Sequence, residues 1–81
     1  MNEAQFQKKV LEYLRTIVGG HWIKIHVSNF QGAGEPDIIG CHQGLFIAIE
    51  LKNPNGKGVV SKLQQYKLEQ IRKANGIALV I

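Results

Sequence analysis

Cysteine, long apolar runs and low-complexity segments are scarce or missing in this chain, and each absence excludes a class of protein. Cys41 is the only cysteine, so an internal disulfide and a cysteine-rich zinc site are both excluded, and a reducing compartment is implied. No apolar run approaches the length of a membrane span, and the first residues lack the basic-then-apolar pattern of a signal peptide. We therefore expect a cytoplasmic protein, or a nuclear one if its host has a nucleus.

The composition is that of one small globular domain with a basic charge. The 81 residues leave room for a single domain, 1–81, and the hydrophobic fraction of 44% and charged fraction of 20% exclude disordered, collagen-like and coiled-coil classes. The net charge of +4 favours a polyanionic partner. Charge alone does not separate nucleic acid from a membrane surface.

Apolar spacing predicts an α/β domain with a mixed sheet flanked by helices. Three- and four-residue spacing indicates helices, two-residue alternation indicates strands, and Gly, Asn and Pro mark the turns. The predicted order is helix, strand, strand, strand, helix, strand, at residues 3–18, 21–27, 37–41, 45–52, 61–74 and 77–81. The second and third strands form a hairpin, and the last is a buried strand reached by a parallel crossover. Residues 53–58 are expected to form a mobile basic loop.

Three charged residues converge in this arrangement. Asp37 opens one strand of the hairpin and Glu50 lies near the end of its partner, so the two carboxylates meet at one end of the sheet. Lys52 lies on the same face as Glu50, because strand side chains repeat every two residues. Two carboxylates are the minimum for a hard divalent cation such as Mg²⁺ or Mn²⁺, and the Leu51 carbonyl could supply another oxygen. The alternative is that Glu50 and Lys52 form an ordinary solvated ion pair.

Two residues outside the hairpin have competing interpretations. Glu3 lies in line with Val10 on the inward face of the first helix, where a carboxylate needs a partner or a metal; alternatively it is a favourable acid in the first helical turn. Glu12 lies on the solvent face. Gln64 either reaches the site from the second helix or closes a capping box with Ser61. A rotamer change could exchange these two roles of Gln64.

The remaining polar and aromatic residues give weaker signals. His21, His26 and His42 lack the spacing of a zinc site, so structural roles are favoured, and Cys41 is expected to be a small core residue. Gly32-Ala33-Gly34 is not a dinucleotide fingerprint, and no small-molecule cofactor is expected. Aromatic side chains could stack on bases or pack in the core, namely Trp22, Phe30 and Tyr66. The pool for phosphate contacts is Lys8, Lys9, Arg15, Lys24, Lys57, Lys62, Lys67, Arg72 and Lys73.

Taken together, these motifs resemble the PD-(D/E)XK nucleases, and within them the VRR-NUC (virus-type replication-repair nuclease) domains, many of which are stand-alone phage proteins. The motifs that carry the resemblance span nearly the whole chain: Glu3 with Phe6-Gln7 and Tyr13-Leu14, then Gly34-Glu35-Pro36-Asp37, Glu50-Leu51-Lys52 and Ser61-Lys62-Leu63-Gln64. Relatives often continue beyond the last predicted strand. We therefore expect some edge or substrate contacts of the family to be missing.

The resemblance implies a restriction-endonuclease-like core and a homodimeric, Mg²⁺- or Mn²⁺-dependent endonuclease that cleaves branched DNA such as four-way (Holliday) junctions. Asp37 and Glu50 would be metal ligands, Lys52 the catalytic lysine and Gln64 the helix-borne polar residue of the site, with Glu3 a tentative ligand. Two alternatives remain. One is a non-catalytic DNA-binding module that keeps the fold, and the other is a small interaction subunit whose charge serves solubility.

Overall fold

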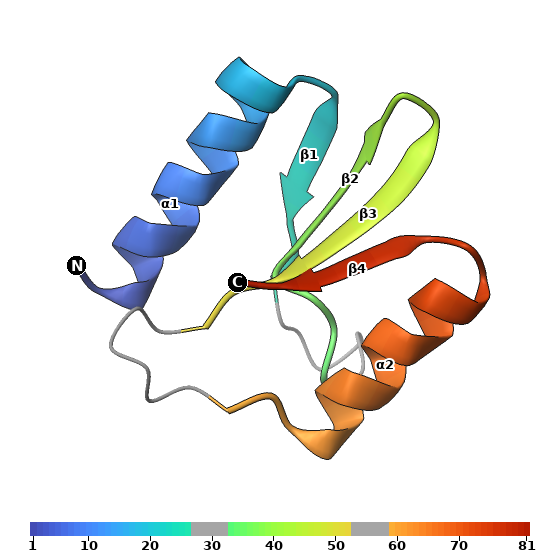
Figure 1. Ribbon diagram of the computed structural model, residues 1–81. Helices are drawn as coiled ribbons and strands as arrows, with labels where there is room; N and C mark the ends of the chain where they lie inside the picture. The colour runs from blue at the N-terminus through green and yellow to red at the C-terminus, as the bar shows by residue number, and fades with distance from the viewer. Residues whose placement is uncertain (27–32, 53–58) are drawn as a thin grey trace.

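The computed structural model describes residues 1–26, 33–52 and 59–81, which form an α/β domain with a four-stranded mixed sheet and two helices (Figure 1). The sheet order is β1-β2-β3-β4. The elements are α1 (Glu3–Tyr13), a π-helical turn (Leu14–Val18), β1 (His21–Lys24), β2 (Ile38–His42), β3 (Leu45–Glu50), α2 (Lys62–Lys73) and β4 (Ile77–Val80). The predicted α/β class with a mixed sheet is confirmed.

The sheet joins an antiparallel meander to one parallel strand. β1 pairs antiparallel with β2, and β2 pairs antiparallel with β3 across a tight turn at Gln43-Gly44, where both residues have positive φ. β4 returns through α2 and pairs parallel with β3. The predicted hairpin and parallel crossover are therefore confirmed.

The main core lies between α1 and one face of the sheet. Trp22 is 2% exposed, and it packs with buried residues of the helical segment and of β2 and β3, namely Leu14, Ile38 and Ile49. Gly40 makes this packing possible, because a Cβ atom there would lie 2.3 Å from a carbon of the Trp22 ring. The Trp22 indole N–H is satisfied by the Gly19 carbonyl at 2.9 Å, so Trp22 belongs to the core and not to a base-stacking surface.

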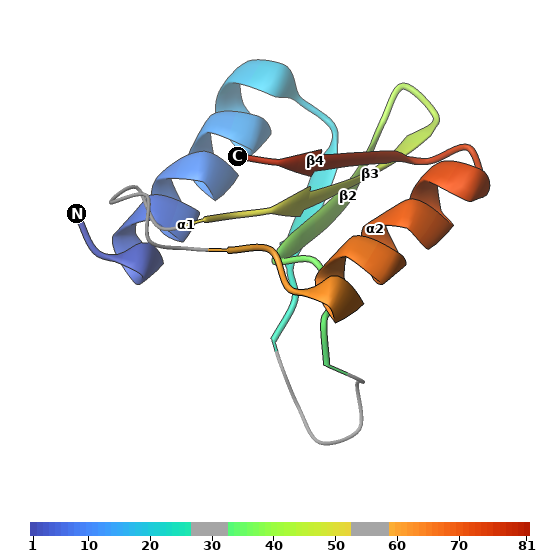
Figure 2. The ribbon, with the colours of Figure 1, turned by 60° about the horizontal axis from the view of Figure 1, so that its bottom comes forward.

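α2 covers part of the opposite face, so the sheet lies between the two helices (Figure 2). Leu68 of α2 is buried, as are Ala48 of β3 and Ala78 of β4. Ser61 caps the start of α2, and Asn75, with φ of 70°, follows its end, as the sequence predicts. Glu50 points to this α2 side, because its neighbours Ile49 and Leu51 belong to the α1-side core.

Three sequence-based expectations are wrong in detail. The first helix does not continue regularly to residue 18; its last turn is π-helical and leaves Ile17 69% exposed. β4 is an edge strand in which only Ala78 is buried, although its apolar run predicted a fully buried strand. Cys41 is exposed, because α2 packs against β4 and does not extend over the β1–β2 side of the sheet.

Three strands are also shorter than predicted, and β2 is shifted by one residue. Asp37 precedes β2, Lys52 follows β3, β1 ends at Lys24 and β4 at Val80. Residues 27–32, with Phe30, and the whole predicted 53–58 loop, with Lys57, lie outside the described residues. No helix in the described part of the chain is long and apolar enough to cross a membrane.

Candidate metal and phosphodiester site

Asp37 and Glu50 come together at the end of the β2–β3 hairpin. Ile38 is paired with Ile49 in the antiparallel register, so one further step along both strands places Asp37 opposite Glu50. The Leu51 amide donates to Asp37 Oδ2 at 2.7 Å and fixes the orientation of that carboxylate. Two residues 13 positions apart in sequence thus contribute carboxyl groups to one place, as their positions in the hairpin predict.

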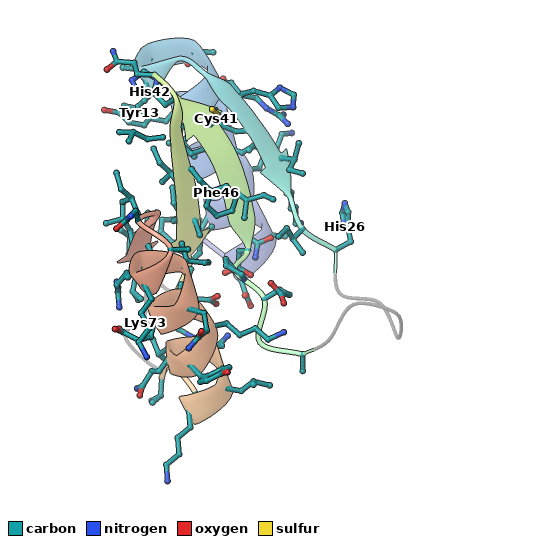
Figure 3. The ribbon with its side chains drawn as sticks, turned by 90° about the vertical axis from the view of Figure 1, so that its right-hand side faces the viewer. Tyr13, His26, Cys41, His42, Phe46 and Lys73 are labelled. Atoms are coloured by element: carbon teal, nitrogen blue, oxygen red, sulfur yellow. The ribbon has the colours of Figure 1, made fainter. Side chains whose placement is uncertain are left out.

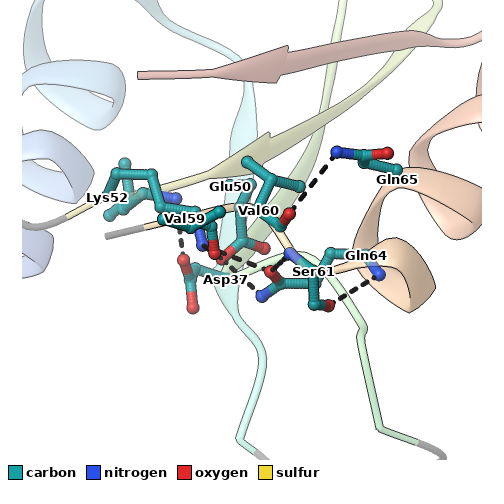
Figure 4. Close-up of polar contacts among 9 residues, drawn as sticks. Asp37, Glu50, Lys52, Val59, Val60, Ser61, Gln64 and Gln65 are labelled. Carbon is teal, nitrogen blue, oxygen red and sulfur yellow. Dashed lines mark hydrogen bonds and ion pairs between the residues drawn. The ribbon is translucent and has the colours of Figure 1, made fainter. Parts of the chain in front are cut away.

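Lys52 and Gln64 join this pair of carboxylates (Figure 4). The Lys52 ammonium lies 3.8 Å from Glu50 Oε1 and donates to Gln64 Oε1 at 3.2 Å. It also donates to the Val59 carbonyl at 3.2 Å. The Gln64 amide nitrogen donates to Glu50 Oε1 at 3.1 Å. The solvated-pair interpretation of Glu50 and Lys52 is therefore wrong, because the Glu50 residue is 3% exposed and Lys52 is held by two acceptors.

Gln64 serves the helix cap and the site in one conformation. The Ser61 hydroxyl accepts a hydrogen bond from the backbone N–H of Gln64 at 3.1 Å, and the side-chain Oε1 of Gln64 accepts one from the backbone N–H of Ser61 at 2.9 Å. These two bonds complete the capping box. The same Oε1 accepts from Lys52, while Nε2 reaches Glu50. The predicted exchange between two rotamers is therefore unnecessary, because the two oxygen lone pairs and the amide N–H groups suffice for both roles.

The surroundings of the Glu50 carboxyl disfavour its ionised form. Its pKa is raised from 4.5 to about 7, chiefly by burial. The neighbouring Asp37 carboxyl contributes to this rise, through the hydrogen bond that the two groups would share if one of them carried a proton and through its negative charge. The Lys52 charge lowers the pKa, whereas the Glu3 charge raises it. The buried Glu50 carboxyl and the Asp37 carboxyl beside it therefore need either a shared proton or an added cation.

The donor set fits a divalent cation bound by oxygen atoms. Glu50 Oε2 is buried and has no hydrogen-bond partner among the described residues, which is costly for a carboxylate oxygen unless something else binds it. The Leu51 carbonyl adds a further oxygen to this set. The backbone groups of Glu50 and Lys52 form hydrogen bonds with Ile81, which follows β4. Because successive residues of a strand direct their backbone groups to alternate sides, the Leu51 N–H and C=O point to the Asp37 side. Oxygen ligands of this type suit Mg²⁺ or Mn²⁺.

Glu3 lies at the margin of this site. It is exposed in the first turn of α1, behind the Asn2 cap, yet its charge acts on Glu50. No three His, Cys, Asp or Glu side chains within residues 1–26, 33–52 and 59–81 form a group that could hold a metal, so Glu3 does not complete one with Asp37 and Glu50. Glu3 is therefore exposed to solvent and not enclosed by the protein, and its role as a ligand stays a prediction.

The segment before Asp37 is anchored to α2 by contacts that sequence reasoning missed. Lys67 forms an ion pair with Glu35, and a Cβ atom on Gly34 would lie 2.7 Å from the Leu63 side chain. Pro36, which lies between Glu35 and Asp37 in the sequence, is fully buried. The Val59 carbonyl that holds Lys52 was also missed, because a backbone acceptor leaves no mark in the sequence. The Lys67–Glu35 pair bridges 32 positions, which local patterns do not reveal.

Two of the three histidines, His21 and His42, lie at the end of the sheet opposite the site, whereas His26 follows Ile25, whose amide donates to the Asp37 carbonyl at 2.8 Å. His21 and Cys41 are opposite one another on β1 and β2, and His42 follows at the same end of the sheet. His26 lies beyond the other end of β1, away from Cys41 and His42 (Figure 3). Tyr66 is exposed on α2, so it stays available for stacking.

No family model, no curated protein and no solved structure matches this chain.

Proposed function

We propose that this chain is a metal-dependent, structure-selective DNA endonuclease of the VRR-NUC type, with a restriction-endonuclease-like core, which hydrolyses phosphodiester bonds in branched DNA such as four-way junctions. The observation that carries the proposal is the buried Oε2 of Glu50, which has no hydrogen-bond partner among the described residues, in a carboxyl group that lies beside Asp37 and pairs with the Lys52 ammonium. A structural ion pair between Glu50 and Lys52 does not require a second carboxyl group beside it. A site that holds a cation next to a phosphate needs one.

Asp37, Glu50 and the Leu51 carbonyl would hold Mg²⁺ or Mn²⁺. When bound, such a cation polarises a phosphate oxygen and lowers the pKa of water enough to provide hydroxide near neutral pH. The orientation of Asp37 is fixed in advance by the Leu51 amide, so little conformational entropy is lost when its carboxylate binds.

Lys52 would supply the positive charge that the transition state requires. Its ammonium is fixed by the Val59 carbonyl and Gln64 Oε1 and is partly accessible, so it can orient the attacking water and stabilise negative charge that develops on the phosphate. Gln64 positions both Lys52 and Glu50 through its two amide atoms. Lys52 and Gln64 would thus act at the phosphate and not at a base, which agrees with an enzyme that recognises the shape of DNA and not its base sequence.

Branched DNA as the substrate rests on the motif resemblance and on the net charge of +4. A cytoplasmic location, in the host cell if a phage encodes the protein, belongs to the same proposal.

The test is cleavage of end-labelled four-way junction, flap and linear duplex with Mg²⁺ or Mn²⁺. Lys52→Met should lower the rate by roughly 10²–10³-fold, the usual effect of losing one charge-stabilising donor. Lys73→Met is the matched control, because Lys73 is an exposed lysine in the last turn of α2, whereas Gln64 lies in the first turn. With saturating DNA, Lys73→Met should cleave within about twofold of wild type, because the loss of a phosphate contact weakens DNA binding and not the chemical step.

Two outcomes would contradict the proposal. If wild type gave no metal-dependent product but bound DNA in a salt-sensitive manner, the chain would be a binding module that keeps the fold. If Lys52→Met and Lys73→Met cleaved equally fast, the reaction would not depend on the assigned site.

A further inference from the structure

The segment that leads into Asp37 runs beside the start of α2 and is attached to this helix at two points (Figure 1). Glu35 forms an ion pair with Lys67, and the side chain of Glu35 is 37% exposed and that of Lys67 24%. One helical turn earlier, the Leu63 side chain lies so close to Gly34 that a Cβ atom there would be 2.7 Å from it. Leu63 and Lys67 are four residues apart, so they lie on the same side of α2. The segment is therefore attached to a single side of the helix.

The backbone between Glu35 and Asp37 has little freedom to absorb a movement. Pro36 is fully buried, and its ring fixes its own φ. A residue that precedes proline is confined to extended conformations, which restricts Glu35 as well. A displacement of Glu35 is therefore transmitted through Pro36 to Asp37.

The same helix also holds the other half of the candidate site. Gln64, next to Leu63 in the first turn of α2, donates to Glu50 through Nε2 and accepts from Lys52 through Oε1 (Figure 4). α2 is a continuous helix, so its side chains keep fixed positions relative to one another. The helix thus contacts Glu50 directly, and it contacts Asp37 indirectly through residues 34–36.

Two simpler roles for Lys67 fit the structure less well. Lys67 is a candidate phosphate contact by its charge, yet its ammonium is engaged by Glu35 and its side chain is partly buried. An ordinary surface ion pair joins exposed side chains and contributes little. The pair of Arg72 with Glu69 is of that kind, because both side chains are about half exposed and lie on one helix. The Lys67–Glu35 pair instead joins α2 to a residue 32 positions away, next to the site.

We propose that Lys67 is a positioning residue, which holds Asp37 beside Glu50 through its ion pair with Glu35. The catalytic consequence rests on the proposed nuclease function, whereas the placement of Asp37 does not. The two are therefore tested separately.

The first test uses NMR on the protein without metal or DNA. The Leu51 amide donates to Asp37 Oδ2 at 2.7 Å, so the shift of its proton reports the placement of Asp37. Lys67→Met should move this resonance upfield, because the hydrogen bond lengthens, and should leave the amide of Ile49 in β3 unchanged. A loss of stability alone moves neither resonance while the protein stays folded. Lys62→Met is the matched control, because it removes the same charge from an exposed position in the first turn of α2.

The second test measures cleavage of a four-way junction with Mg²⁺. Lys67→Met should lower kcat roughly tenfold and leave KM for DNA within about twofold of wild type, because misplacing a reacting group slows the chemical step. Lys67→Arg keeps the charge and the ion pair, so it should restore both kcat and the position of the Leu51 resonance.

Three outcomes separate this inference from the proposed function. An unchanged Leu51 resonance in Lys67→Met, or the same change in Lys62→Met, would overturn the inference. A raised KM with an unchanged kcat would also overturn it, because Lys67 would then be a phosphate contact. If the Leu51 resonance moved selectively but wild type gave no metal-dependent product, the nuclease function would fail and the role of Lys67 in placing Asp37 would stand.

Discussion

Replacing Glu50 with glutamine should stabilise the protein when no metal is bound, although it removes a group from the proposed site. The Glu50 carboxyl is buried next to Asp37, and its ionised form is disfavoured there. Glutamine has nearly the same shape and no charge. Its oxygen can still accept from Gln64 Nε2, and its amide can donate to the Asp37 carboxylate, so no buried polar group is left without a partner.

The magnitude follows from the pKa of Glu50, which rises from 4.5 to about 7 on folding. Between these values the folded protein holds a proton that the unfolded chain has released, so stability falls as the pH rises through this window. Below pH 4.5 both states are protonated and the penalty vanishes; above pH 7 it is complete, at about 3 kcal/mol. Glu50→Gln removes this penalty. In a domain of this size, that corresponds to an increase of roughly 10 °C or more in Tm at pH 8.

The assay is urea unfolding in EDTA at pH 5 and pH 8. Glu50→Gln should exceed wild type by up to about 3 kcal/mol at pH 8 and by much less at pH 5. Glu12→Gln removes the same charge from an exposed position on α1 and should change stability little at either pH. If Glu50→Gln were less stable than wild type at pH 8, or if both had the same pH dependence, the reasoning about this carboxyl group would be refuted.

Three further predictions concern the metal, the cap and the core. Mg²⁺ should raise the Tm of wild type more at pH 8 than at pH 6, because it competes with the Glu50 proton, and it should leave Glu50→Gln unchanged; calorimetry with and without EDTA measures this. Ser61→Ala should lower the free energy of unfolding by about 1 kcal/mol and slow DNA cleavage, because the cap helps to hold Gln64, whereas Ser61→Asp should restore both. Gly40→Ala should cost about 1–3 kcal/mol in urea unfolding by forcing Trp22 to move.

The parts of the structure that the sequence predicts are those governed by short-range rules. Two-residue alternation places Glu50 and Lys52 on one face, and hairpin pairing brings Asp37 beside them. The pair of Ser61 with Gln64 predicts the start of α2 because both halves of a capping box lie within four residues. Each of these rules uses positions a few residues apart or one tight turn.

The expectations that fail depend on what covers a surface. The apolar run of β4 predicts burial, but the sheet ends there, and neither the order of strands nor the absence of a neighbour is encoded locally. Cys41 has the character of a core residue, yet its exposure depends on where α2 crosses the sheet. The π-helical turn at Leu14–Val18 likewise places Leu14 against Trp22, a contact made after the chain has turned back.

Folding and metal binding should be linked in this small domain. The Glu50 carboxyl lowers stability by about 3 kcal/mol above pH 7, a large part of the 5–15 kcal/mol typical of a folded domain. A cation present at 100 times its Kd contributes about 2.7 kcal/mol to the folded state, which nearly offsets that penalty. The carboxyl group that lowers the stability of the metal-free protein is thus the group that would make metal binding favourable. Lys52 and Gln64 extend this linkage from β3 to the start of α2, so ligand binding should order the hairpin end and the helix cap together.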